Sequence, residues 1–233
     1  MLSKTDFVDM RPILPPLMHT ICLVYTHSKY YNTTARIIVL MQELCNLIID
    51  LARKSLDPQT IFHNEVEESL ESIKIAIRNF REFKACYQEY KARLSTYFGP
   101  EDTFRPWDFR EALIFQRLDN FMDRLETLME FFNTAVQFQK LERIEIGGLR
   151  GKALTHHVEK VYKEFSDLYV VFKIKTYDCL DPEDRGFLED YEKFNTGIAS
   201  LDRKLGAIFN RAFDDCIVRY KSSMGLNFTT LFQ

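Results

Sequence analysis

The chain has 233 residues and a net charge of −3, with 46% hydrophobic and 28% charged residues. This balance predicts one large or two small folded domains with a sizeable core, and it excludes a disordered chain. The small negative charge excludes a general basic field, and no stretch reaches the ~20 apolar residues of a membrane span. We therefore expect neither nucleic acid nor a membrane as a partner.

Bulky rings are unusually frequent, with 20 Phe and 11 Tyr against only 8 Gly and 7 Pro. Such a composition favours long regular elements joined by few loops, because glycine and proline are the residues that most often interrupt helices. The five cysteines are odd in number, far apart and mostly on apolar helical faces, and no C-x-x-C occurs. We expect reduced thiols in an intracellular compartment, with no zinc site and no secretory signal.

The first half of the chain begins with two predicted helices. A proline-rich start followed by an apolar run predicts a short helix over 12–28. The sequence Asn32-Thr33-Thr34 offers capping oxygens for a second helix that ends near Lys54. Its apolar stripe is broad and includes Leu47, so we expect this helix to be nearly buried.

Two longer helices follow, over about 64–97 and 109–140, with apolar residues three and four positions apart. Lys84 and Lys91 fall on the apolar seam of the first, which favours a packed bundle over an extended two-stranded coil. The segment 99–106 between these helices, which contains Gly, Pro and acidic residues, predicts a softer joint.

The second half predicts two more helices, over about 152–175 and 183–221. Before them, residues 141–146 alternate apolar and polar, which predicts a very short extended segment. The end, 224–233, is apolar without a charge pattern of its own. Together these patterns predict an all-α, elongated bundle of long helices with short turns.

The motif closest to a nucleotide site is Gly147-Gly148-Leu149-Arg150-Gly151-Lys152-Ala153. A phosphate-binding loop needs a glycine at position 146 and a hydroxyl at position 153, where this chain has Ile146 and Ala153. The motif therefore indicates a flexible glycine turn before a helix. We expect no cofactor to bind there.

No other set of polar residues has the spacing of a catalytic or metal site. His156 and His157 are adjacent and point to different helical faces, and His19, His27 and His63 are isolated. Asp214 and Asp215 have no histidine beside them and are interpreted as solvated or salt-bridged charges. We expect no catalytic residue, no cofactor site and no metal site.

Aromatic residues are the remaining candidates for function. Trp107 is the only Trp and lies between two predicted helices with Phe109, where it could pack one helix start against another or anchor a partner protein. Tyr30 and Tyr31 place bulky groups on adjacent faces, which a helix with a single seam cannot bury. We therefore name Trp107, Phe109, Tyr30 and Tyr31 as candidate interface residues.

Several segments together carry a resemblance to a known family, from about Pro12 to Tyr220. They are Arg105-Pro-Trp-Asp-Phe109, Phe115-x-Arg117-Leu118-Asp119-x-Phe121, Leu141-Glu-Arg-Ile-Glu-Ile-Gly-Gly-Leu-Arg-Gly151, Tyr177-Asp178-x-Leu180-Asp181-Pro182 and Leu201-Asp202-Arg203-Lys204-Leu205-Gly206. The order and spacing of these segments resemble the N-terminal tail region of dynein heavy chains, most closely the axonemal outer-arm beta type.

The resemblance implies a non-catalytic tail segment of a microtubule motor that acts in the ciliary axoneme, within the cytoplasm and cytoskeleton. It implies a single tail-like helical domain over 1–233. The implied partners are dynein heavy, intermediate and light chains, with an indirect association with microtubules. The family's ATPase ring lies beyond this region, and 224–233 does not resemble the family's continuation. An enzyme that binds nucleotide at the glycine turn and an unrelated cytosolic helical adaptor or tethering subunit remain alternatives.

Overall fold

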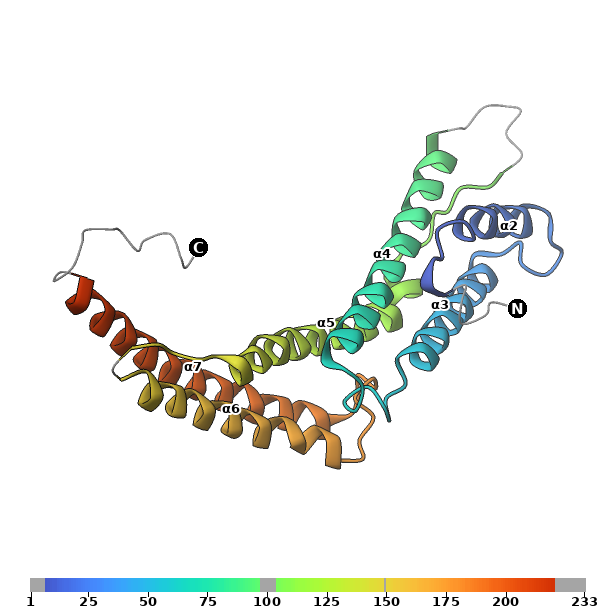
Figure 1. Cartoon of the computed structure of the whole chain (residues 1–233). Coiled ribbons are helices and arrows are strands. Elements are labelled where there is room, and N and C mark those ends of the chain that lie inside the picture. Colours follow the sequence, from blue (N-terminus) through green and yellow to red (C-terminus); the bar gives the residue numbers. More distant parts are fainter. Residues whose placement is uncertain (1–6, 97–103, 149, 221–233) are drawn as a thin grey trace. The chain divides into compact units, whose positions relative to one another are not determined.

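The computed structural model describes residues 7–96, 104–148 and 150–220, and helices are the only regular elements in these ranges. The long helices are α2 (Leu14–His27), α3 (Thr34–Leu56), α4 (Val66–Thr96), α5 (Ala112–Gln139), α6 (Gly151–Ile174) and α7 (Arg185–Tyr220) (Figure 1). Each lies within a few residues of the helix that the apolar spacing predicts, a difference typical of helix ends. The all-α class is confirmed.

The prediction of a short extended segment over 141–146 is wrong for its first part. Residues Lys140–Arg143 form a short 3-10 helix, η1, directly after α5, and the backbone becomes extended only at Ile144. The side chain of Leu141 is buried, so the 3-10 turn packs this residue into the core without forming a strand. An alternation over only six residues fits both arrangements, and tertiary packing selects the helical turn.

The described chain forms two compact units. The first comprises Met1–Phe132 with Asp178–Asp184, and the second comprises Asn133–Tyr177 with Arg185–Gln233. The division falls within α5. The joint that we predicted at 99–106 lies largely outside the described residues, as does the end at 224–233, so both stay predictions.

The first unit is built around α4, which packs against α2 and α3. Rings connect α4 to α5, with Phe80 against Phe121 at 5.8 Å and Phe83 against Phe115 at 6.0 Å between ring centroids. These edge-on pairs use the attraction between the positive ring edge and the negative ring face. The surplus of Phe in the composition therefore lies in the contact between long helices.

The two lysines on the α4 seam reach carboxylates of α5 and of the segment before it. Lys84 Nζ lies 2.6 Å from Asp119 and Lys91 Nζ lies 2.7 Å from Glu111. Each long side chain lies along the apolar seam and places its ammonium group at the edge, where it meets an acid. This arrangement is that of a packed bundle, as the position of the two lysines predicts.

Helix α3 is less buried than its broad apolar stripe suggests. Ile37, Met41 and Ile48 are in the core, whereas Val39 is 54% exposed and Leu47 is 46% exposed. The expectation that this helix is nearly buried is therefore wrong, because packing covers one face and leaves the opposite face to solvent.

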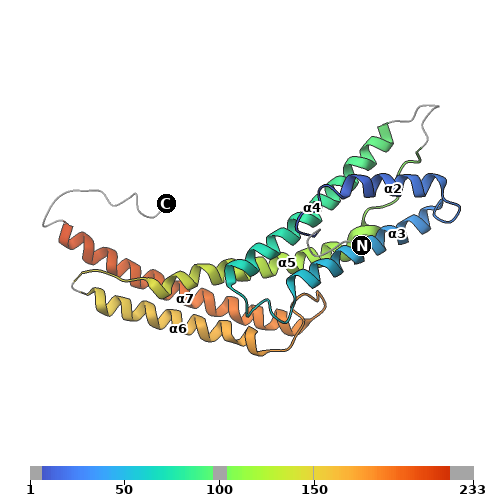
Figure 2. The same cartoon turned by 45° about the vertical axis from the view of Figure 1, so that its right-hand side comes forward.

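In the second unit, α6 and α7 form an antiparallel pair (Figure 1, Figure 2). Glu164 pairs with Lys204, while Phe172 contacts Phe187 with 6.0 Å between ring centroids. Gly197 lets the helices approach closely, since a Cβ at this position would lie 2.6 Å from a methyl of Leu168.

Candidate interaction sites

Trp107 and Phe109 lie in the core of the first unit. Trp107 is 2% exposed and stacks on Tyr87 of α4 with 5.0 Å between ring centroids, and Phe109 is 5% exposed and meets Tyr25 of α2 edge-on. Arg105 covers the outer face of Tyr25, with its guanidinium 4.3 Å from the ring centroid. Of the two alternatives for Trp107, the structure has the one in which the ring packs inside the protein. Trp107 and Phe109 connect the segment before α5 to α4 and α2.

Burial also places two polar atoms of this cluster in the core. Tyr87 Oη and Trp107 Nε1 have no hydrogen-bond partner among the described residues. Desolvation raises the pKa of Tyr87, and the nearby carboxylate of Glu111 raises it further. The stacked rings are therefore held by their apolar faces, since neither polar atom contributes a bond within the described part of the chain.

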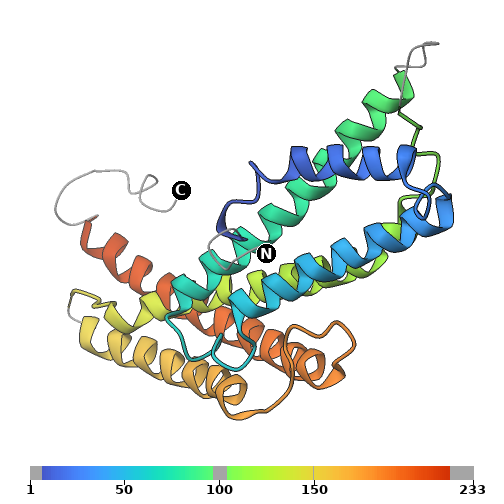
Figure 3. The ribbon, with the colours of Figure 1, turned by 90° about the vertical axis from the view of Figure 1, so that its right-hand side faces the viewer.

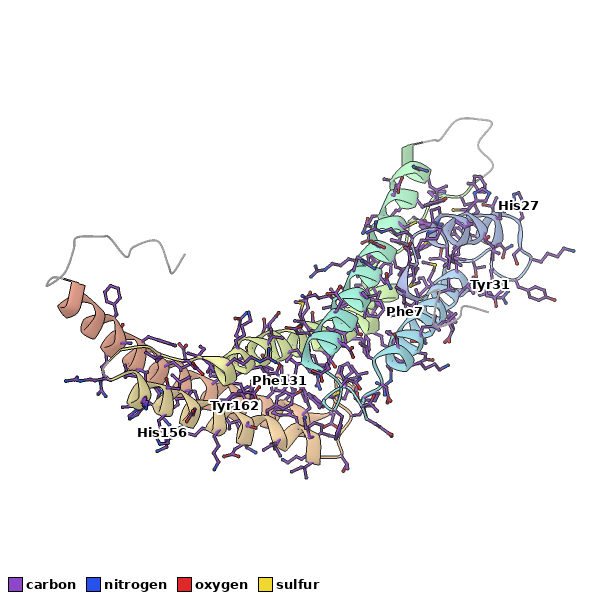
Figure 4. All side chains as sticks on the ribbon, viewed as in Figure 1. Phe7, His27, Tyr31, Phe131, His156 and Tyr162 are labelled. Carbon is purple, nitrogen blue, oxygen red and sulfur yellow. The ribbon has the colours of Figure 1, made fainter. Side chains whose placement is uncertain are left out.

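Tyr30 and Tyr31 lie in the loop between α2 and α3, and they are the exposed pair among the four candidates. Tyr30 is 74% and Tyr31 is 39% exposed. Figure 4 shows Tyr31 on this loop. The loop is ordered by its own hydrogen bonds, because Ser28 Oγ accepts from the backbone N–H of both tyrosines at 3.2 Å and Arg36 donates to the carbonyl of Tyr30 at 2.8 Å. Two exposed rings on a held backbone are well suited to contact another protein.

The glycine turn folds tightly onto the start of α6. Gly148 has a φ of 103°, and the N–H of Gly151 donates to the carbonyl of Gly148 at 3.1 Å. The N–H of Ile146 donates to Thr155 Oγ1 at 2.9 Å, and a Cβ on Gly151 would lie only 2.1 Å from the carbonyl oxygen of Ile146. Close backbone contact therefore explains why Gly151 is a glycine.

Substitution of Gly151 by Ala is expected to destabilise the second unit by about 2 kcal/mol, because the added Cβ displaces the backbone at Ile146. The matched change Gly206→Ala in α7 meets no atom within 4 Å and is expected to stabilise the chain by about 0.5–1 kcal/mol. Urea unfolding followed by circular dichroism measures both effects. Equal effects of the two changes would contradict the steric role of Gly151.

The histidines of α6 form no metal site. His156 and His157 are exposed, and His156 Nδ1 lies 3.4 Å from Glu159 of the same helix. Figure 4 shows His156 on α6. Within the described ranges, no three His, Cys, Asp or Glu residues form a group that could hold a metal ion. The same ranges contain no helix long and apolar enough to cross a membrane.

Three of the cysteines are buried thiols. Burial raises the pKa of Cys22 to about 11 and the pKa values of Cys45 and Cys179 to about 12. Cys86 is half-buried, and burial raises its pKa as well. The thiolate is the nucleophilic form of cysteine, so the buried three are unreactive at neutral pH.

At pH 8 we expect iodoacetamide to modify Cys86 at least about tenfold faster than Cys45 or Cys179, because the latter two are inaccessible and protonated. Peptide mapping by mass spectrometry measures the rates, and unfolding in urea should equalise them.

Above a pH of about 9 the thiols of Cys45 and Cys179 ionise in the unfolded chain while they stay protonated in the folded one. This difference predicts a stability that falls as pH rises from about 9 towards 12.

One structural residue did not stand out in the sequence. Arg124 of α5 is 4% exposed and donates to three backbone carbonyls of the segment 178–184. Its partners are the carbonyls of Cys179 at 3.3 Å, Pro182 at 3.0 Å and Asp184 at 3.2 Å. Its position in the sequence could have indicated this burial. Arg124 lies three residues after Phe121 and four residues before Leu128, and this spacing places it on the core face of the helix.

The fold and these sites define an all-α packing module whose described residues form no metal cluster. The chain belongs to the dynein heavy chain family, since residues 1–232 match the family described as Dynein heavy chain, N-terminal region 1.

Among curated proteins the chain is similar to "Dynein beta chain, ciliary" of Tripneustes gratilla, with 46% identity over 92% of the chain. It is similar to "Dynein axonemal heavy chain 11" of Sus scrofa at 41% identity and to "Dynein beta chain, flagellar outer arm" of Chlamydomonas reinhardtii at 38% identity, each over 92% of the chain. The chain spans about 5% of the length of these relatives.

Proposed function

We propose that this chain is a non-catalytic tail segment of an axonemal dynein heavy chain. It acts as a scaffold that pairs with other heavy chains and binds intermediate and light chains of a ciliary microtubule motor. The match of residues 1–232 to the N-terminal region of dynein heavy chains carries this proposal. The ciliary and axonemal names of the relatives support a place in the axoneme, where the association with microtubules is indirect.

The loop between α2 and α3 is the proposed contact with a partner subunit. Tyr30 and Tyr31 are exposed, and their backbone is held by Ser28 and Arg36, so little conformational entropy is lost when a partner covers the rings. Phe109 supports this contact indirectly, because it packs against Tyr25 of α2, the helix that leads into the loop, and Trp107 packs on Phe109.

Affinity purification of the tagged chain from ciliated cells tests the proposal. We expect dynein heavy, intermediate and light chains among the recovered proteins, identified by mass spectrometry. The double change Tyr30→Ser with Tyr31→Ser should lower their recovery at least about tenfold, because a tyrosine anchor contributes on the order of 2 kcal/mol.

The matched control is His156→Ser with His157→Ser, a second pair of adjacent exposed rings, on α6. It should leave the recovery of dynein subunits unchanged. Recovery of the chain without any dynein subunit would overturn the proposed function, and an equal loss for both pairs would overturn the assignment to Tyr30 and Tyr31.

The non-catalytic part of the proposal has its own test at the glycine turn. Titration of the purified chain with ATP and magnesium should give no saturable binding, since the turn lacks the hydroxyl of a phosphate-binding loop. Binding of ATP that is lost with Lys152→Ala would favour the nucleotide-binding alternative.

A further inference from the structure

A polar groove runs between α3 and α5 in the first unit and is also lined by Asp181, Pro182 and Glu183. Its volume is about 840 Å³, within the range of sites that enclose a ligand or a short peptide. Gln42 Nε2 donates to the carbonyl of Leu113 at 2.7 Å, and Arg117 donates to Asn46 Oδ1 at 2.8 Å. Both pairs are 71 positions apart, so α3 and α5 run in the same direction. Figure 2 and Figure 3 show this direction of the two helices.

Each helix presents two amide side chains to the groove, one turn apart. Gln42 and Asn46 come from α3, and Gln116 and Asn120 come from α5. Gln42 and Asn46 each use one amide atom in the bonds just described, whereas the side-chain amides of Gln116 and Asn120 have no hydrogen-bond partner among the described residues. An amide offers both a donor and an acceptor, as does each peptide group of a polypeptide backbone.

The spacing of these amides matches an extended chain. Side chains four residues apart on a helix are separated by about 6 Å along the axis, from a rise of ~1.5 Å per residue. Every second residue of an extended chain advances by about 6.7 Å, from a rise of ~3.3 Å per residue. Successive amides on one helix can therefore bond alternate peptide groups of an extended segment.

The charge of the groove selects the side chains of that segment. Four carboxylates line it, those of Glu43, Asp50, Asp181 and Glu183. Of the two guanidinium groups that line it, Arg53 is paired with Asp178, whereas Arg117 bonds the neutral amide of Asn46 and keeps its charge. The carboxylates therefore outnumber the unpaired cation. None of the four carboxylates has a salt bridge to a cation among the described residues, so the groove has a net negative field.

We propose that this groove binds an extended, arginine- or lysine-bearing segment of another polypeptide. The four amides bond the backbone of the segment, and Asp50, Asp181 and Glu183 pair with its basic side chains. A helical segment fits less well, because its backbone groups are already paired within the helix. The carboxylates disfavour nucleic acid and other anions.

Fluorescence anisotropy with the purified full chain tests this proposal. The probe is a labelled hexapeptide of alternating arginine and threonine, and its control replaces each arginine with glutamate. We expect saturable binding of the basic peptide that weakens with added salt, and no binding of the acidic one. A helical alanine-based peptide with the same three arginines should bind more weakly.

Two double variants separate backbone from charge recognition. Gln116→Ala with Asn120→Ala should weaken binding about threefold to tenfold, and Asp50→Asn with Glu183→Gln should weaken it at least about tenfold. All four positions are exposed, so the fold should be retained. The matched control is Glu67→Gln with Glu68→Gln, which removes two exposed carboxylates from the start of α4 and should leave binding unchanged.

Absence of saturable binding would overturn the proposal, as would an equal loss with the α4 control, which would indicate general electrostatic attraction. Equal or tighter binding of the helical peptide would overturn recognition of an extended backbone. The titration uses the purified chain alone, so its result is independent of whether dynein subunits are recovered from ciliated cells.

Discussion

Replacing Trp107 with Ala is expected to lower the free energy of unfolding of the first unit by about 3–5 kcal/mol. The ring is 2% exposed and stacks on both Tyr87 and Phe109, so its removal leaves a cavity at the junction of α2, α4 and the segment before α5. Urea unfolding followed by circular dichroism, with hydrogen exchange to assign the loss to the first unit, measures the effect.

Tyr30→Ala is the control for this prediction, because it removes an aromatic ring that is 74% exposed. Its effect on stability should stay within about 0.5 kcal/mol. If Trp107→Ala left the stability unchanged and lowered the recovery of partner proteins, Trp107 would be a contact anchor rather than a packing residue.

Replacing Arg124 with Met is expected to destabilise the first unit by about 3 kcal/mol or more. The change leaves the carbonyls of Cys179, Pro182 and Asp184 without the donor that now binds them, and buried groups left unpaired cost about 1–3 kcal/mol each. Faster hydrogen exchange in the segment 178–184, together with a lower urea midpoint, would confirm the prediction.

Arg117→Met is the matched control, since Arg117 is on the same helix and exposed. Its single bond to Asn46 is at the surface, so its loss should cost less than about 0.5 kcal/mol. Similar effects of the two substitutions would mean that burial of Arg124 does not hold the segment 178–184.

The helices were predictable because their signal is local and repeated. Leu118, Phe121, Leu125 and Leu128 keep a helical spacing along α5, and all four are buried. The same reasoning failed for residues 141–146, where a short alternation is satisfied by a 3-10 turn, and for Leu47, which belongs to the stripe of α3 but remains 46% exposed. A periodic pattern identifies an apolar face but not which part of it a neighbour covers.

The candidate sites were less predictable, because their character depends on residues distant in sequence. Trp107 is a core residue through its contact with Tyr87, 20 positions earlier, while Tyr30 and Tyr31 stay exposed. The polar groove joins residues of α3 and α5 that are 71 positions apart. Neither arrangement has a spacing that can be read along the chain.

The sequence by itself determined the all-α class, the approximate helix ends and the membership in the dynein heavy chain family. It could do so because apolar periodicity and the order of short segments are properties of the sequence alone. Only the tertiary structure decided that Trp107 is buried, that Arg124 holds the segment 178–184 and that the amides of α3 and α5 line one groove. The physical reason is that burial and hydrogen bonding depend on which helices pack together, and an apolar face alone does not specify its neighbour. The abundance of Phe and Tyr therefore predicted packing. The structure located it between α2 and the segment before α5, between α4 and α5, and between α6 and α7.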